Sequence, residues 1–218
     1  MFSSIKAQWK FAFVMLLGLS LMLIAFVVLD NFGVFDGNKA KTRENQKQMV
    51  EEAVAYINAK NYDIMYYGDD LDAPASFKVR RIYSFDQVEV VGNEENRNCN
   101  GKMLIINDVS GTCFLTASQW ERISFLREND EFIVVYLGNS QFEAMSQVGL
   151  SGAELATSNS VLFATNKNGV MWTQTGIADD DSFLPETVRS GLTKAQLPVY
   201  RLIMNLQHWD KVRAGGIF

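Results

Sequence analysis

The sequence has very little of the chemistry that most metal sites need. It contains one histidine, His208, and two cysteines, Cys99 and Cys113. A single histidine excludes a site built from several imidazoles, and two cysteines exclude a four-cysteine zinc site. Proline is also scarce, with three residues in 218, whereas 48% of the residues are hydrophobic. This balance excludes a disordered chain and predicts a domain with a substantial hydrophobic core.

Positive charge is scarce beyond the first ten residues. The chain has 20 Lys and Arg residues against 25 Asp and Glu residues, and its net charge is −5. Only Lys6 and Lys10 precede position 30, so the remainder carries 18 bases and 25 acids. Nucleic-acid binding needs clustered lysine and arginine for the phosphates. An acidic domain without a basic stripe therefore excludes nucleic acid as the partner.

Two short acidic runs are the remaining candidates for ion binding. The first comprises Asp69, Asp70 and Asp72, and the second comprises residues 179–181. Neither run has the D-x-D-x-D-G spacing and distal glutamate of a calcium loop. We interpret both as solvated acidic turns, and His208 as a surface or helix-end residue. We therefore expect no metal site and no cofactor.

One long hydrophobic run lies near the N-terminus. Residues 11–29 carry no charge, and Ser20 is their only hydroxyl. With a rise of 1.5 Å per residue, a helix of this length is about long enough to cross a bilayer core of ~30 Å. Lys6 and Lys10 precede the run. The positive-inside rule therefore places residues 1–10 in the cytoplasm and the rest of the chain outside.

A cleaved secretory signal is the competing interpretation of this run. The hydrophobic core of a signal peptide usually spans 7–15 residues and precedes a small-residue cleavage site, and here the run is longer and no such site follows closely. We expect an uncleaved single-pass anchor in the cell inner membrane, with the C-terminal domain in the periplasm. Residues 30–72 would be a linker with a membrane-proximal helix, and residues 73–218 the folded domain. Partners would be exported or membrane proteins.

Hydrophobic periodicity predicts alternating strands and helices in the domain. Helical spacing predicts a helix over residues 42–60, and alternation predicts a strand over residues 77–85 with a neighbour at residues 87–91. The later elements are, in chain order, a strand at 103–106, a helix at 118–128, a strand at 132–137, a helix from 140, a hairpin with strands at 161–165 and 170–175, and helical sequence from 183 onward.

The predicted order fixes the class of fold. Two Ser-x-x-Glu capping boxes, Ser118 to Glu121 and Ser140 to Glu143, mark the starts of two helices. A strand–helix–strand unit implies parallel pairing through a right-handed crossover, and the hairpin adds an antiparallel pair. The sequence therefore predicts an α/β fold with a mixed sheet flanked by helices.

Four motifs in this region resemble those of one family. They are Ala73-Pro-Ala-Ser-Phe77 (an APxF entry), Gly101-Lys-Met-Leu-Ile-Ile-Asn107 (a GKxxLxN first core strand), Cys113 six residues beyond Asn107, and the hairpin segment from Val161 to Val170 followed by Gly176. Together they resemble the TlpA-type branch of membrane-anchored thioredoxin-like thiol–disulfide oxidoreductases. The resemblance spans residues 73–178 and the order of the elements after them.

The active-site motif departs from that family. Its W-C-x-x-C pattern is here Thr112-Cys113-Phe114-Leu115-Thr116, and Ser160 takes the place of the family's cis-proline. Thr116 replaces the second cysteine, so two-thiol exchange cannot run, because release of a mixed disulfide needs a second thiolate. The resemblance implies that Cys113 lies at a helix N-terminus, where the helix dipole lowers the pKa of its thiol. It implies monothiol exchange or redox-linked maturation of exported proteins.

Cys99 leaves two interpretations open. A Cys99–Cys113 disulfide would close a loop of about 15 residues and stabilise the domain by ~3 kcal/mol. The resemblance instead puts the strand at residues 103–107 between the two cysteines, about 16 Å long, whereas a disulfide needs Cα atoms within about 7 Å. Both cysteines are therefore candidate site residues, either reactive or structural.

A non-catalytic assembly or interaction protein of a membrane complex is the alternative function. Such a protein would keep the fold without the redox chemistry, and Cys113 would survive as a small buried apolar residue. The pKa of Cys113 distinguishes the two functions. Thiol exchange requires a value well below the ~8.5 of a free cysteine.

Overall fold

The structure, a computed structural model, describes residues 34–88, 99–127, 132–150, 158–165, 171–212 and 216–218, with residues 15, 18–20 and 22 before them. The chain divides into two units, Met1–Asn45 and Gln46–Phe218. Among the described residues there is no helix of the length and hydrophobicity that a bilayer crossing requires. The predicted anchor at residues 11–29 lies mostly outside the described residues, as does the N-terminal segment at 1–10.

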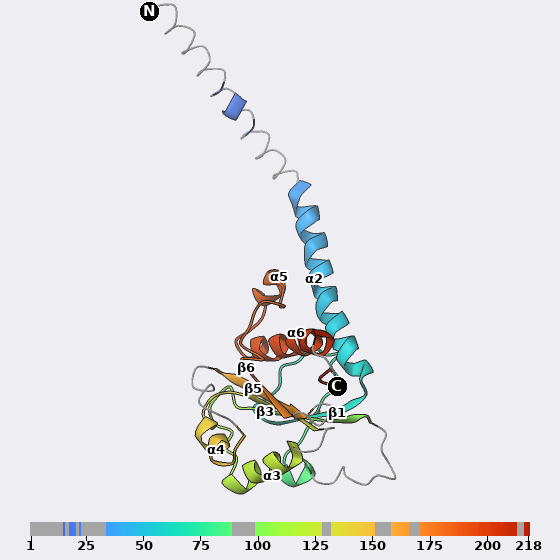
Figure 1. Ribbon diagram of the computed structural model, residues 1–218. Coiled ribbons are helices and arrows are strands. Elements are labelled where there is room, and N and C mark those ends of the chain that lie inside the picture. The colour runs from blue at the N-terminus through green and yellow to red at the C-terminus, as the bar shows by residue number, and fades with distance from the viewer. Residues whose placement is uncertain are drawn as a thin grey trace, which may run out of the picture. The chain divides into compact units, whose positions relative to one another are not determined.

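A six-stranded mixed sheet forms the centre of the second unit (Figure 1). Its strands are β1 (Tyr62–Gly68), β2 (Arg80–Arg81), β3 (Gly101–Asn107), β4 (Phe132–Leu137), β5 (Ser160–Thr165) and β6 (Met171–Thr175). Their order across the sheet is β2-β1-β3-β4-β5-β6. The first four are parallel, whereas β5 is antiparallel to β4 and β6 is antiparallel to β5. The predicted α/β fold with a mixed sheet is therefore confirmed.

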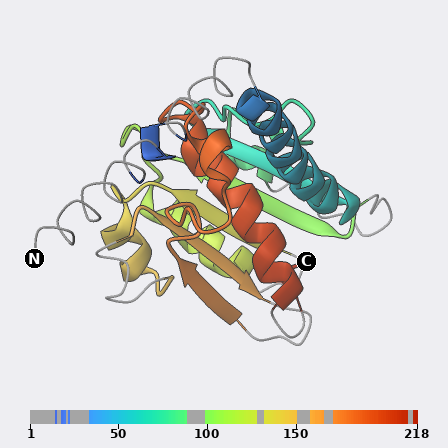
Figure 2. The ribbon, with the colours of Figure 1, turned by 90° about the horizontal axis from the view of Figure 1, so that it is seen from above.

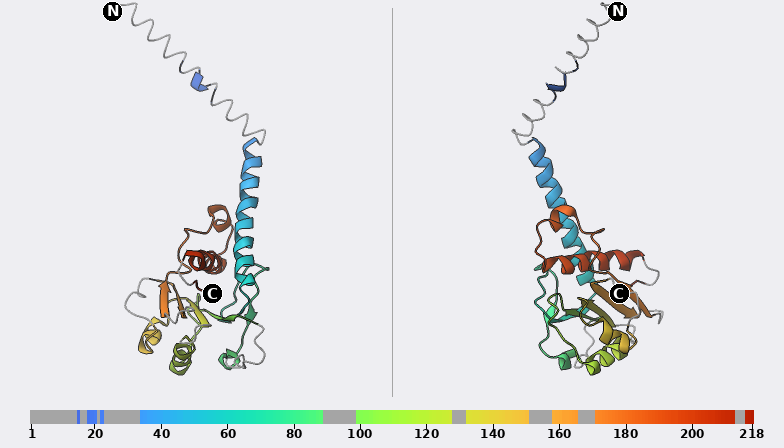
Figure 3. Two further views of the ribbon diagram at one scale, coloured as in Figure 1. Left: turned by 45° about the vertical axis from the view of Figure 1, so that its right-hand side comes forward. Right: turned by 90° about the vertical axis from the view of Figure 1, so that its left-hand side faces the viewer.

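Helices cover both faces of the sheet (Figures 2 and 3). The helices are α2 (Val34–Ala59), α3 (Ala117–Arg127), α4 (Phe142–Gln147), α5 (Glu186–Arg189) and α6 (Gln196–Val212), with a 3-10 helix η1 at Phe85–Val88. The C-terminal part of α2 lies beside α6 on one face, and α3 and α4 lie on the other (Figure 1). The helix-flanked sheet is the arrangement that the element order predicts.

Successive apolar side chains of β3 point to opposite faces of the sheet, and both faces are covered by helices. Successive side chains of a strand point to opposite faces. Met103 and Ile105 of β3 accordingly belong to the core under α2 and α6, whereas Leu104 and Ile106 belong to the core under α3 and α4. All four side chains are fully buried. A strand with four consecutive apolar residues, as at residues 103–106, buries both of its faces when helices cover the sheet on both sides.

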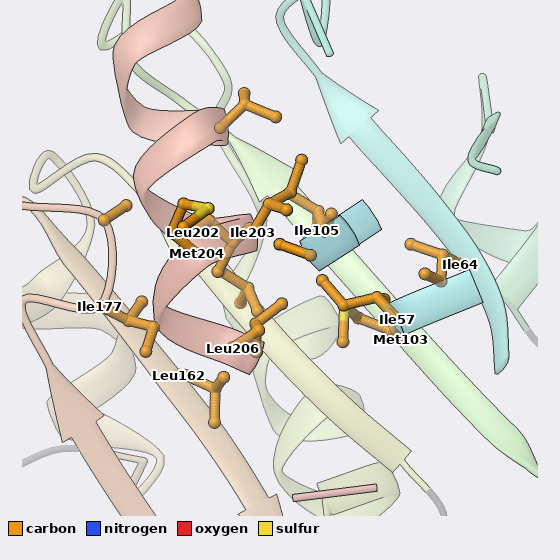
Figure 4. Packing of buried hydrophobic residues seen from close by; sticks show 14 of the residues in the cluster. Ile57, Ile64, Met103, Ile105, Leu162, Ile177, Leu202, Ile203, Met204 and Leu206 are labelled. Carbon is orange, nitrogen blue, oxygen red and sulfur yellow. The ribbon is translucent and has the colours of Figure 1, made fainter. Parts of the chain in front are cut away.

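The core under α2 and α6 joins distant parts of the sequence (Figure 4). Ile57 of α2 and Leu206 of α6 both belong to it, together with Ile64 of β1 and Leu162 of β5. Burying each such side chain contributes ~1.5–3 kcal/mol. Because they contribute to this core, β1 and the C-terminal end of α2 are parts of the folded domain.

Asp210 of α6 connects α2 to the last two residues. Its carboxylate accepts the hydroxyl of Tyr56 at 2.6 Å, the ammonium of Lys60 at 2.7 Å and the backbone N–H of Phe218 at 2.9 Å. A further N–H comes from Ile217. Burial by itself would raise the pKa of Asp210, but these hydrogen bonds outweigh it and hold the pKa below its usual range. The carboxylate therefore stabilises the folded domain.

The predicted strand at residues 77–85 is wrong for most of its length. Only Arg80–Arg81 is a strand, and η1 at Phe85–Val88 overlaps the predicted neighbour at 87–91. Phe77, Ile82 and Phe85 of this segment are buried because a loop packs them against the domain, whereas Tyr83 is exposed, so their spacing is not that of a strand. The strand that does pair here, β1, was not predicted. Helix α2 begins at Val34, eight residues before the start predicted at residue 42.

The first predicted capping box is displaced and the second does not form. The N-terminus of α3 is capped by Thr116, whose hydroxyl accepts the N–H of Gln119 at 3.3 Å, while the Gln119 side chain accepts the N–H of Thr116 at 2.8 Å. This is the same reciprocal geometry, two residues before Ser118. In α4 the N-cap residue Gln141 makes no capping bond, and Ser140 instead donates to Asp108.

Candidate functional site

A pocket lies at the ends of the neighbouring strands β1 and β3, after which the chain continues toward opposite edges of the sheet. After β1 the chain continues to β2 on one side, and after β3 it continues to β4 on the other. In open α/β sheets such a reversal leaves a crevice at the carboxyl ends of the two strands, where ligands bind. Residues 67–69, 81–83 and 112–114 line a pocket of about 450 Å³ at this position, here called the β1–β3 pocket.

Cys113 lines this pocket, but its thiol is largely buried. The residue is 8% exposed. Gly68, at φ +100°, lies so close that a Cβ there would be 2.7 Å from the Cys113 sulfur and 2.3 Å from the carbonyl oxygen of Asn107. Burial raises the pKa of the thiol to about 11, and the negative charges of Asp108 and Asp69 add to the rise. The thiol is therefore protonated at neutral pH.

The helix dipole does not reach Cys113 as the resemblance implies. Helix α3 begins at Ala117 and Thr116 is its cap, so Cys113 lies four residues before the first helical residue. The dipole effect fades within the first turn of a helix. The backbone N–H of Cys113 is itself occupied, since it donates to Asp108 at 2.8 Å. Nothing in this geometry favours the thiolate.

A buried polar network holds the loop that carries Cys113. The carboxylate of Asp108, which is 1% exposed, accepts hydrogen bonds from the Tyr136 hydroxyl at 2.6 Å and from Ser140. The side chain of Gln141 accepts the N–H of Leu115 at 2.8 Å and donates to the carbonyl oxygen of Cys113. Burial and the bond to Asp108 raise the pKa of Tyr136. The end of β4 thus fixes the loop after β3.

Two aromatic side chains stand exposed at the rim of the pocket. Tyr83 is 78% exposed and Phe114 is 70% exposed. The guanidinium of Arg81 lies 5.3 Å from the ring centroid of Tyr83 and 5.6 Å from that of Tyr66. It also pairs with Asp70 and donates to the carbonyl oxygen of Gly68 at 3.0 Å. A cation–aromatic stack therefore supports Tyr83 in its exposed position.

The two candidate cysteines are not brought together. Cys99 precedes β3, Cys113 follows it, and both are free thiols. Cys99 is partly exposed next to Asn100, whose N–H donates to the carbonyl oxygen of Asn61 at 2.8 Å. The two cysteines lie at opposite ends of a seven-residue strand, as the second sequence interpretation expects. Only Cys113 belongs to the pocket.

Ser160, at the position that corresponds to the family's cis-proline, lies outside the pocket. It begins β5, which pairs with β4 and not with β3. Its hydroxyl accepts the N–H of Ala178 at 2.8 Å and donates to Asp179 at 3.2 Å. These bonds join β5 to the turn after β6. Ser160 is therefore not among the described residues that line the pocket with Cys113.

The acidic runs and His208 make structural contacts. Asp69 accepts the N–H of Ser110 at 2.8 Å, and Asp181 forms a salt bridge with Arg201 at 2.7 Å. His208 stacks on Phe183 with ring centroids 3.7 Å apart. Across the described part of the chain, no group of three His, Cys, Asp or Glu side chains is arranged to hold a metal ion.

No family model, curated protein or solved structure matches this chain. The function is therefore argued from the geometry of the β1–β3 pocket.

Sequence reasoning found Cys113 but missed what surrounds it. Asp108 comes two residues after the apolar run at residues 103–106, where a buried carboxylate marks a network or a site. That signal was available. No sequence signal pointed to Gln141 or Gly68, because the first acts on Cys113, 28 residues away, and the second through its close approach to the Cys113 sulfur.

Proposed function

We propose that the chain is a membrane-anchored, non-catalytic interaction protein whose folded domain binds a partner protein at the β1–β3 pocket. The observation that supports this most is the state of Cys113. Its sulfur is packed against Gly68 and has a pKa of about 11, while Tyr83 and Phe114 stand exposed beside it. The pocket offers a surface for contact, and its cysteine is not an activated thiol.

Thiol–disulfide exchange fits this geometry poorly. The thiolate is the reacting species, and a thiol of pKa about 11 is ionised in roughly one molecule in ten thousand at pH 7. Thr116, which replaces the second cysteine, uses its hydroxyl as the cap of α3. The thioredoxin-like resemblance rests on short motifs and element order. The proposal does not depend on it, because β1 and the segment after β3 build the pocket.

Residues 11–29 support the membrane part of the proposal. They form an uncharged run of the length that crosses a bilayer, preceded by Lys6 and Lys10. We propose that this run anchors the chain in the inner membrane with the domain in the periplasm. The domain would then meet exported proteins or the outer parts of membrane proteins.

The reactivity of Cys113 tests the proposal. The full-length variant C99S leaves Cys113 as the only thiol, and C113S leaves Cys99 as the matched control. Both are treated with iodoacetamide between pH 6 and pH 10, folded and in urea. We expect folded C99S to react far more slowly than folded C113S below about pH 9, and the difference to vanish in urea.

Fast alkylation of folded C99S at or below pH 7 would mean that Cys113 is an activated thiol. That result would remove the non-catalytic proposal and restore monothiol exchange. Slow alkylation of both variants would show that exposure is limited at both positions. The rate in C99S must then rise with pH as a thiol of raised pKa requires, or the proposal fails.

A further inference from the structure

The charge around the β1–β3 pocket is predominantly negative. Asp69 lines it, Asp70 is paired with the lining residue Arg81 and its side chain is 84% exposed, and the buried Asp108 accepts the backbone N–H of Cys113. Among the described residues that line the pocket, Arg81 is the one cation and Asp69 the one acid. Counted with Asp70 and Asp108 nearby, the described charges in and around the pocket are three carboxylates and one guanidinium.

Arg81 is already committed to contacts within the domain. It pairs with Asp70, donates to the carbonyl oxygen of Gly68 at 3.0 Å and lies between the rings of Tyr66 and Tyr83. An acidic ligand would have to displace Asp70 and disturb this stack. The pocket is therefore poorly suited to bind an anion.

Asp69, which lines the pocket, retains acceptor capacity. One carboxylate oxygen accepts the Ser110 N–H at 2.8 Å and the other accepts the Ser110 hydroxyl at 2.9 Å. An ionised carboxylate has about four lone-pair positions, so two of them remain for a donor on a ligand. An arginine or lysine side chain is the donor that also matches the sign of the charge.

The exposed aromatic rim favours the same ligand. The rings of Tyr83 and Phe114 present large apolar faces in the same pocket as the carboxylate of Asp69. A cation over such a face gains ~0.5–1 kcal/mol at an exposed site. The Tyr66–Arg81–Tyr83 stack is an example of this contact made by the domain itself.

We propose that the partner presents a lysine or arginine next to an aromatic or aliphatic side chain, with the cation against Asp69 and the apolar side chain against Phe114 and Tyr83. This inference rests on the proposed function, since it names the chemistry of the segment that the pocket binds. The net acidity of the chain outside its first ten residues agrees with a basic partner.

Short peptides test the charge of the ligand. The probes are fluorescently labelled acetyl-Leu-Arg-Phe-Arg-Leu-amide and the matched peptides with Glu or Gln in place of Arg, titrated into the full-length chain and followed by anisotropy. We expect the Arg peptide to bind at least about tenfold more tightly than the Gln peptide. Added salt should weaken the Arg complex, since salt screens exposed charges.

Three variants place the binding site. F114A and Y83A should each weaken the Arg peptide several-fold, and D69N should reduce its advantage over the Gln peptide to less than about threefold. E143Q, which removes an exposed acid on α4, and F125A, which removes an exposed ring on α3, are the matched controls and should bind like the unaltered chain. Thermal melting of each variant checks that the domain is folded.

The outcomes separate this inference from the proposed function. If the Gln or Glu peptide binds as tightly as the Arg peptide, and F114A weakens it, the pocket is a docking site but its ligand is not basic. If none of the peptides binds, or if F125A weakens binding as much as F114A and Y83A do, the pocket is not the docking site. The proposed function then fails together with the inference.

Discussion

At the scale of single residues, Gly68 determines how closely β1 and the Cys113 loop approach. A side chain there would need a backbone conformation that non-glycine residues rarely adopt, at φ +100°, and would collide with Asn107 and Cys113. The collision partner at Asn107 is a backbone oxygen, which cannot move aside as the end of a flexible side chain does. The close packing of β1 against Cys113 in the pocket therefore requires that residue 68 has no side chain.

Gly68→Ala should consequently lower the free energy of unfolding by about 2–4 kcal/mol, from overpacking added to backbone strain. Gly111→Ala is the matched control. Gly111 also has a positive φ, +73°, but a Cβ there meets nothing within 4 Å, so we expect a loss of only about 1 kcal/mol. Urea unfolding of the two variants measures the difference. Equal losses would show that strain alone, without the close approach, accounts for Gly68.

Asp210 is the residue from which a pH dependence follows. Its pKa in the folded domain is below its ordinary value. Its stabilising contribution is therefore fully present above about pH 4 and is lost as the pH falls through the folded pKa. Asp210→Asn should lower the free energy of unfolding by about 2–4 kcal/mol at pH 7, because Lys60 loses a buried partner.

Urea unfolding at pH 7 and at successively lower pH checks this prediction. The gap between Asp210→Asn and the unaltered chain should narrow as the pH falls below about 4. Glu121→Gln, at an exposed position on α3, is the control and should change stability by less than about 0.5 kcal/mol. A gap that stays constant down to the lowest pH would mean that the charge of Asp210 does not stabilise the fold.

At the scale of elements, two capping boxes compete for the start of α3: Thr116 with Gln119, which the structure shows, and Ser118 with Glu121, which the sequence pattern predicts. Thr116→Ala should destabilise the domain by about 1 kcal/mol, since it removes the cap that Thr116 and Gln119 form. Ser118→Ala should change stability by less than about 0.5 kcal/mol, because Ser118 lies inside the first turn. Urea unfolding compares the two. A larger loss at Ser118 would place the helix start where the sequence pattern alone puts it.

The elements that sequence reasoning predicts well are those with a continuous local signal. The strand at 132–137 is apolar at all six positions, and its predicted bounds match β4. The hairpin strands differ from β5 and β6 by one residue at their starts. Each of these signals lies within the element itself, so no distant partner was needed to read it.

The helix predicted at 42–60 overlaps α2, Val34–Ala59, but the strands between residues 60 and 100 were predicted poorly because their burial comes from tertiary contacts. β1 carries Asp63 and alternates only weakly, and it is a strand because β2 and β3 pair with it on both sides. Asp63 is accommodated because the Arg80 guanidinium binds it at 2.9 and 3.0 Å. The strand order across the sheet, and with it the pocket between β1 and β3, depends on this pairing.

At the scale of the whole molecule, the anchor is the feature to test first. Leu17→Arg with Leu21→Arg places two charges in the hydrophobic run, each costing ~2.5–3.5 kcal/mol near the centre of a spanning helix. We expect the unaltered chain to stay in the membrane fraction after carbonate extraction and this double variant to leave it. Ser3→Arg with Ser4→Arg adds the same charge before the run and should stay membrane-bound.

Extraction of the unaltered chain by carbonate would contradict the anchor. So would retention of the Leu17 and Leu21 double variant in the membrane. If instead the chain is found free with residues 1–29 missing, the run is a cleaved signal and not an anchor.

The contacts of Asp210 have a consequence for how the domain is made. Tyr56 and Asp210 are 154 positions apart, and synthesis delivers α2 long before α6 and the last residues. Until then Val54 and Ile57 have no α6 to cover them, and the nascent domain presents an apolar helix face. Long-range contacts of this kind slow folding and expose partly folded chains to aggregation. A newly made chain is therefore most exposed to aggregation in the interval before α6 appears.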